Sequence, residues 1–212
     1  MQTSPPLKPA VKNAGDSLAI AWLRTLVAKG PRALQREHLR YKPQTHAAPR
    51  LHLIVLDTSG SMRQGGQGGR LALAKGHAAH IISQAARAGD RVALLCFGGS
   101  GVQLVLPPGP ARAAGAARVR QCGGGGGTPL RQALLVANNL LAHARRSSSN
   151  GPAWFWLLTD GRTLERPTAP KGADHAVVLD FDELSPASRA SGRCAAWAAS
   201  WGAEYRLVTA TV

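Results

Sequence analysis

The sequence predicts an α/β protein in which helices cover both faces of a largely parallel sheet. Short, uncharged apolar runs rich in Leu and Val alternate with longer stretches whose apolar residues recur at helical spacing. The composition agrees, because 44% of the residues are hydrophobic but only 5% are aromatic, so the core must be built from Ala, Leu and Val. At 212 residues the chain fits one main domain with a short extension.

Three segments are expected along the chain: a mobile tail at 1–15, a helical appendage at 16–48 and the main domain at 49–212. The tail is rich in Pro and Lys. The appendage starts with a helix that Asp16 caps and Gly30 ends, and its apolar residues share one face: Leu18, Trp22, Leu23, Leu26 and Val27. We expect this appendage to pack on the main domain.

The main domain opens with a buried strand at 51–56 that runs into Asp57. A helix that Gly89 ends comes next, and its apolar positions at helical spacing are Leu71, Ala74, Ala78, Ile81, Ile82 and Ala85. Strands at 91–97 and 102–106 follow, and the intervening sequence GGSG predicts a tight reversal. This hairpin makes one edge strand of the sheet antiparallel.

The second half of the domain continues the alternation of helices and strands. Five glycines at 123–127 lead to Thr128, which we expect to cap a helix with Pro129 at its first position. A later strand again delivers a carboxylate, Asp160, at its carboxyl end. The expected elements are a short helix at 110–121, a helix at 128–146, strands at 153–159 and 175–181, a helix at 186–201 and a last strand at 204–212.

Five oxygen-bearing side chains are candidates for a metal site: Asp57, Ser59, Ser61, Thr128 and Asp160. In open parallel sheets, ligands bind beyond the carboxyl ends of the strands, where both aspartates are placed. Ligands that offer only oxygen favour a hard cation, Mg²⁺ or Mn²⁺, over zinc or copper. With only two carboxylates, the bound ion stays electrophilic and can accept a further carboxylate from another molecule.

The charge of +15 raises the question of nucleic-acid binding. The basic residues are mostly Arg, are dispersed along the whole chain and form no run of four, and they lack interleaved aromatic residues. This dispersed pattern argues against a nucleic-acid partner. Steep salt-dependent DNA binding that ignores Mg²⁺ would be the contrary observation.

Cysteine usage and hydropathy predict a cytoplasmic protein without a membrane partner. The three cysteines are far apart in sequence and form no Cys-x-x-Cys pair, which argues against a disulfide framework or a thiolate zinc site. The amino-terminal sequence lacks the apolar core of a signal peptide, and no window of eighteen residues is apolar enough to span a bilayer.

Other readings of the same residues are weaker. A nucleophilic Ser59 or Ser61 would need a histidine base, and DTSGS does not have the spacing of the Gly-x-Ser-x-Gly elbow. His77 and His80 stand one helical turn apart and could form half of a transition-metal site, but packed or solvent-facing histidines explain them better. The five glycines could cradle a phosphate, but no Lys follows them.

The segments LDTSGSM, GGGGTPL and LLTDGR resemble, in this order, the three parts of the metal-ion-dependent adhesion site (MIDAS) of von Willebrand factor type A (VWA) domains. LALAKGHAAHII, GDRVALLCFGG and LVLPPG are similar, more narrowly, to the carboxy-terminal VWA domain of the D subunit of magnesium and cobalt chelatases. The resemblance implies a Rossmann-like, three-layer α/β/α domain with a six-stranded sheet. It also implies Ser59, Ser61 and Thr128 as hydroxyl ligands of Mg²⁺, with Asp57 and Asp160 bound directly or through water.

The function that this resemblance implies is a non-catalytic, Mg²⁺-dependent interaction subunit. It would couple an AAA+ ATPase of the chelatase I type, and a large chelatase subunit, to metal insertion into a tetrapyrrole. An acidic residue of the partner would bind the metal. The alternative is an adaptor of a MoxR-type AAA+ ATPase that remodels another client.

Two departures from the family pattern limit this reading. The ATPase-like domain and the acidic linker of the fuller D subunits are missing from this chain, and no phosphate-binding loop occurs, so we do not expect ATP hydrolysis. In addition, the FGG sequence at 97–99 stands where D subunits commonly have an Arg between Phe and Gly.

Overall fold

A computed structural model describes residues 20–40, 48–64, 69–146, 151–182 and 192–208. Contacts divide the chain into two units, Met1–His46 and Ala47–Val212. The first unit contains helix α1 (Trp22–Lys29) and a 3₁₀ turn, η1 (Arg36–His38). In its described residues, the second contains a six-stranded sheet, four α-helices and a further 3₁₀ turn.

The sheet confirms the predicted architecture. Its order is β3-β2-β1-β4-β5-β6, and only β3 runs antiparallel to its neighbour, β2. The strands are β1 (Leu51–Asp57), β2 (Arg91–Gly98), β3 (Gly101–Pro110), β4 (Ala153–Thr159), β5 (His175–Asp180) and β6 (Glu204–Leu207). The chain therefore forms one mixed sheet whose two central strands are β1 and β4.

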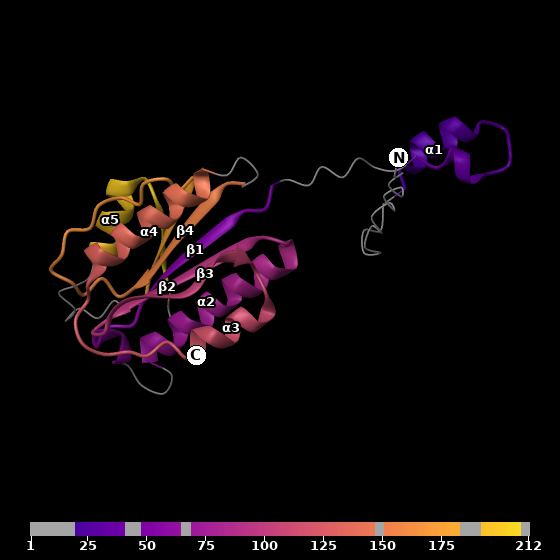
Figure 1. Cartoon of the computed structure of the whole chain (residues 1–212). Coiled ribbons are helices and arrows are strands. Elements are labelled where there is room, and N and C mark those ends of the chain that lie inside the picture. Colours follow the sequence, from indigo (N-terminus) through magenta and orange to yellow (C-terminus); the bar gives the residue numbers. More distant parts are fainter. Residues whose placement is uncertain (1–19, 41–47, 65–68, 147–150, 183–191, 209–212) are drawn as a thin grey trace, which may run out of the picture. The chain divides into compact units, whose positions relative to one another are not determined.

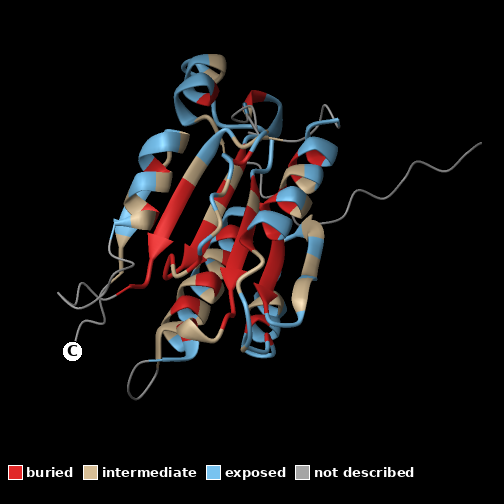
Figure 2. Cartoon of the chain, turned by 90° about the vertical axis from the view of Figure 1, so that its left-hand side faces the viewer, coloured by how far each residue is buried: buried red, intermediate tan, exposed pale blue. Residues whose placement is uncertain are grey.

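Helices cover both faces of this sheet, which gives three layers (Figure 1). Helices α2 (Gly69–Ala88) and α3 (Ala113–Arg120) lie on one face, and α4 (Leu130–Arg145) and α5 (Arg193–Trp201) on the other. Alternate residues of β1 enter the two cores, because Leu53 and Val55 pack under α4 while Ile54 and Leu56 pack under α2. Figure 2 shows the central strands as the most deeply buried part of the sheet.

Several element boundaries differ from those expected. Helix α1 begins at Trp22 rather than near Asp16, because the Ala21 amide donates to the carbonyl of Arg40 and Ala21 is not helical. Strand β3 runs on to Pro110, which an edge strand tolerates because its outer side needs no amide donor. Helix α3 consequently starts at Ala113.

The last helix and the last strand are both shorter than expected. Gly192 has a left-handed backbone (φ 98°) and precedes α5, so the helix starts at Arg193. Strand β6 ends at Leu207. Asp16, Leu18 and the expected elements at 186–191 and 209–212 lie outside the described residues.

The expectation for the start of α4 was wrong. Thr128 does not cap this helix: Pro129 has φ −78° and ψ 60°, and the Leu130 amide donates to the Thr128 carbonyl at 2.8 Å. These values describe an inverse γ-turn centred on Pro129. The turn places Thr128 outside the helix, so its hydroxyl is not used in capping.

The apolar side chains expected on one face of α1 are exposed, including Trp22 and Leu26. The packing of this part of the chain on the main domain stays a prediction.

None of the helices in the described ranges combines the length and apolar content needed to cross a membrane.

Candidate metal centre

The two aspartates predicted from the sequence lie at the carboxyl ends of adjacent parallel strands. Strand β1 ends at Asp57, and β4 ends at Thr159, one residue before Asp160. Leu56 pairs with Leu158, so the register sets Asp57 beside Thr159. Both carboxylates are almost completely buried.

Asp57 is held by two donors from different segments. Its Oδ1 accepts the Ser59 amide at 2.8 Å, and its Oδ2 accepts the Thr159 hydroxyl at 2.6 Å. Burial raises the pKa of Asp57 to about 6, the two hydrogen bonds oppose this rise, and the nearby Asp160 charge adds to it. A carboxylate in this environment gains from a compensating cation.

Ser59 and Ser61 follow in the loop that leaves β1. Their hydroxyl oxygens are 3.2 Å apart, so the two side chains point to the same place. Ser59 is buried and Ser61 begins a short 3₁₀ turn, η2 (Ser61–Arg63). Each hydroxyl contacts the other rather than an imidazole, so the geometry gives no support to a catalytic serine.

The glycine-rich loop at 123–127 lies against the Asp57 loop. The Gly125 amide donates to the Thr58 carbonyl at 2.8 Å, and the Gly60 amide donates to the Gly126 carbonyl at 3.1 Å. Thr128 follows directly and lines a hollow of about 370 Å³ together with Pro129 and Glu165. The structure thus brings the Thr128 loop to the Asp57 loop, while Thr128 as a ligand stays a prediction.

Asp160 carries the clearest indication of a cation. Its Oδ1 accepts the Arg162 amide at 3.1 Å, but its Oδ2 is buried and has no hydrogen-bond partner. The Arg162 Nε lies 3.9 Å from that oxygen, too far for a hydrogen bond. Because an unsatisfied buried carboxylate oxygen is costly, this site fits a hard cation such as Mg²⁺, which the surrounding oxygen donors would hold.

Two residues near the site were not among the predicted ligands. Thr159 orients Asp57, and Arg162 links Asp160 to the buried Asp182 through a 2.9 Å contact with Asp182 Oδ1. Both residues lie in the segment LLTDGR. The Thr159 contact depends on β1 and β4 ending side by side, and the Arg162 contact on β4 and β5 doing so. The linear spacing does not reveal either arrangement.

Other candidate sites are less suitable. The His77 ring contacts the edge or face of Phe181, and His80 lies 3.3 Å from the Gln84 side-chain nitrogen. Within the part of the chain that the structure describes, no three His, Cys, Asp or Glu side chains are arranged to hold a metal. The histidine pair therefore gains no third ligand of these types.

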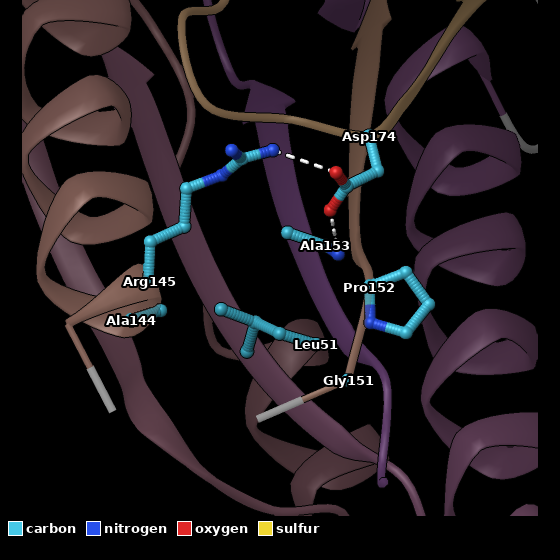
Figure 3. A pocket seen from close by; sticks show the side chains of 7 residues that line it. All are labelled: Leu51, Ala144, Arg145, Gly151, Pro152, Ala153 and Asp174. Atoms are coloured by element: carbon cyan, nitrogen blue, oxygen red, sulfur yellow. Dashed lines mark hydrogen bonds and ion pairs between the residues drawn. The ribbon is translucent and has the colours of Figure 1, made fainter. Parts of the chain in front are cut away.

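A separate hollow of about 280 Å³ opens at the other end of β1 and β4 (Figure 3). Arg145 and Asp174 close one side of it through a 2.6 Å ion pair, and Asp174 also accepts the Ala153 amide at 2.7 Å. Both carboxylate oxygens of Asp174 thus accept a hydrogen bond, whereas only one oxygen of Asp160 does. Asp174 therefore serves as a control residue for the metal site.

We expect Thr159→Val to destabilise the protein and weaken Mg²⁺ binding. The valine keeps the shape but removes the hydroxyl that donates to buried Asp57, which costs about 2 kcal/mol of unfolding free energy at pH 7.5. Urea denaturation and calorimetric Mg²⁺ titration measure the two effects. Thr159→Ser, which keeps the hydroxyl, is the control, and an unchanged urea midpoint in the valine variant would contradict the assigned role.

Comparison with known proteins agrees with this geometry. Residues 52–162, just over half of the chain, match the family model described as the von Willebrand factor type A domain. The chain is 35% identical over 126 residues to the magnesium-chelatase 60 kDa subunit of Cereibacter sphaeroides, covering 58% of this chain and 21% of that protein. It is 29% identical over 148 residues to the 67 kDa subunit of Chlorobaculum tepidum, covering 67% and 23%. The chain thus spans less than a quarter of these relatives.

Solved structures support the fold. BatB from Bacteroides thetaiotaomicron superposes with a TM-score of 0.59 at 20% identity, covering 76% of this chain and 91% of that one. The SpRpn10 VWA domain gives 0.53 at 12% identity, covering 76% and 88%. With the matched segment spanning both aspartates and the loops between them, the chain belongs to the von Willebrand factor type A domain family.

Proposed function

We propose that this VWA domain is a non-catalytic, Mg²⁺-dependent interaction module that resembles the D subunit of magnesium and cobalt chelatases. The observation that carries the proposal is the buried Oδ2 of Asp160, which accepts no hydrogen bond, beside Asp57. The proposed ligands are Asp57, Ser59, Ser61, Thr128 and Asp160. When bound, the ion supplies positive charge and a coordination position for an outside carboxylate.

The residues of this chain prepare the site for that role. Thr159 and the Ser59 amide hold Asp57 in place, so the carboxylate needs little reorganisation when a cation arrives. The three hydroxyl ligands carry no charge, which leaves two carboxylates against a divalent ion. The two carboxylates balance the charge of the ion without exceeding it, so an acidic side chain of a partner would meet an open coordination position rather than a net negative site.

The partner class follows from the relatives. Two magnesium-chelatase subunits align with this chain over its VWA region, which supports a place in metal insertion into a tetrapyrrole. We infer that the domain passes the conformational cycle of an AAA+ ATPase to a large chelatase subunit. The three cysteines are free thiols, which favours a cytoplasmic setting for this assembly.

The experiment is co-purification with the immobilised protein from its native host, with Mg²⁺ or with EDTA. Wild type should retain an AAA+ ATPase in Mg²⁺ and release it in EDTA, and Asp57→Ala should retain none. Asp174→Ala is the matched control, because its carboxylate pairs with Arg145 at the other end of the strands.

Survival of ATPase capture in both Asp57→Ala and EDTA would show that the metal does not mediate the contact. Mg²⁺-dependent capture of a MoxR-type ATPase without a large chelatase subunit would keep the metal mechanism but replace the chelatase role. Identification of the retained chains by mass spectrometry separates these outcomes.

A further inference from the structure

Two of the three cysteines meet inside the α2 and α3 side of the domain. Cys96 lies on β2, and Cys122 lies two residues after the end of α3. Their Sγ atoms are 2.7 Å apart, closer than unbonded sulfur atoms ordinarily approach, and both residues are buried. Cys194 is on α5, in the core of the opposite face. Their separation in sequence concealed this pairing.

We propose that Cys96 and Cys122 are a reversible redox modification site, at which a peroxide oxidises the two thiols to a disulfide. The contact needs to shorten only from 2.7 Å to about 2.0 Å, the length of a disulfide bond. Both cysteines belong to the same core cluster, so the movement stays within it. The proposal does not depend on the metal centre.

Cys122 is the better nucleophile of the pair. The hydrogen bond from Cys96 and the positive charge of Lys75 lower the pKa of Cys122, while the same hydrogen bond and burial raise the pKa of Cys96. Lys75 is held near by a 3.2 Å bond to the Arg120 carbonyl. A thiol whose pKa a cation and a second thiol lower, in direct contact with that second thiol, has the arrangement of a reactive cysteine with its resolving partner.

The reaction proceeds in two balanced steps. The Cys122 thiolate attacks one oxygen of hydrogen peroxide, the O–O bond breaks, and hydroxide leaves as Cys122 becomes a sulfenic acid. The Cys96 sulfur then attacks the Cys122 sulfur, the S–O bond breaks, and the hydroxyl leaves as water with the Cys96 proton. The two sulfurs lose two electrons in total, and one hydrogen peroxide accepts them and is reduced to one water and one hydroxide. The proton that Cys122 released when it ionised converts this hydroxide to a second water. A small dithiol reverses the product by thiol–disulfide exchange.

The disulfide would fix the base of the glycine-rich loop. Cys122 directly precedes Gly123, and the same loop contacts Thr58 through Gly125 and Gly60 through Gly126. Tying Cys122 to β2 restrains the amino-terminal end of this loop. Oxidation should therefore slow amide hydrogen exchange at 123–127 several-fold and raise the melting temperature by roughly 5 °C.

The test treats the whole, metal-free protein with stoichiometric hydrogen peroxide, alkylates the remaining thiols and digests with trypsin. We expect one alkylated cysteine, Cys194, and a linked pair of peptides, 92–112 and 121–131, lighter by two hydrogen atoms than the sum of the free peptides. Dithiothreitol should restore three alkylated cysteines. Cys194→Ser should form the same link.

The single variants distinguish the two thiols. Cys96→Ser should leave a Cys122 sulfenic acid that dimedone traps, and Cys122→Ser should give neither link nor trap. Three alkylated cysteines after peroxide, or a wild-type Cys122 that becomes sulfenic or sulfinic acid without linking to Cys96, would overturn the proposal. Wild-type circular dichroism is required of each variant, and the wild-type digest alone decides the matter if a variant fails to fold.

Discussion

Asp57→Asn should make the metal-free protein more stable and at the same time abolish its response to Mg²⁺. Burial raises the pKa of Asp57 to about 6 from 3.8, so the folded state disfavours the ionised form. At pH 7.5 this shift opposes folding by about 2 to 3 kcal/mol, and an uncharged asparagine avoids that cost. The Thr159 hydroxyl can reverse to accept from the new amide group.

The sign of the pH dependence follows from the same shift. Because the folded pKa lies above the unfolded one, the folded protein holds its proton more tightly, and this group's contribution to stability falls as pH rises from about 4 to about 6. Metal-free wild type should therefore lose stability over this window relative to Asp57→Asn. Excess Mg²⁺ at pH 7.5 should restore it in wild type only.

Urea denaturation at pH 5 and pH 7.5, with EDTA or with excess Mg²⁺, measures both effects. Asp174→Asn is the matched control, because it removes the charge of a half-exposed carboxylate that lies at the start of β4, away from Asp57. This variant should keep the full Mg²⁺ response. A Mg²⁺-induced stabilisation of Asp57→Asn equal to that of wild type would show that Asp57 does not contribute to the metal site.

Much of this site could be predicted from the chain because its aspartates follow buried strands. The apolar run before Asp57 and the run before Asp160 both predicted parallel strands, and parallel strands place their carboxyl ends at one edge. The hairpin at 98–101 likewise predicted the antiparallel edge strand, since Gly98 and Gly101 close it. Local periodicity was sufficient for these conclusions.

The parts that could not be predicted depend on contacts between distant segments. Thr128 followed a capping pattern, yet an inverse γ-turn at Pro129 turned it away from the helix end. Cys96 and Cys122 are separated by a strand and a helix, and only the packing of α3 brings them together. Neither outcome is contained in the spacing of residue types, because both arise from how loops fit against the sheet.

Gly99→Ala should weaken Mg²⁺ binding without altering any proposed ligand, because Gly99 packs closely against the glycine-rich loop at 123–127. A Cβ on Gly99 would collide with the carbonyl oxygen of Gly125 and the Cα of Gly126, both of them backbone atoms. Gly126 in turn accepts the Gly60 amide in the Asp57 loop. The added methyl group must displace the glycine-rich loop from Gly99 and so disturb the Gly126 carbonyl that accepts the Gly60 amide.

We expect Gly99→Ala to lose about 1 to 3 kcal/mol of stability through overpacking and at least about tenfold in Mg²⁺ affinity, because small displacements of supporting residues change metal binding on this scale. Gly123→Ala is the matched control in the same loop, since a Cβ there meets no atom within 4 Å. Calorimetric Mg²⁺ titration and urea denaturation compare the two. Equal Mg²⁺ affinity in both variants would mean that the close approach of Gly99 to Gly125 and Gly126 does not support the site.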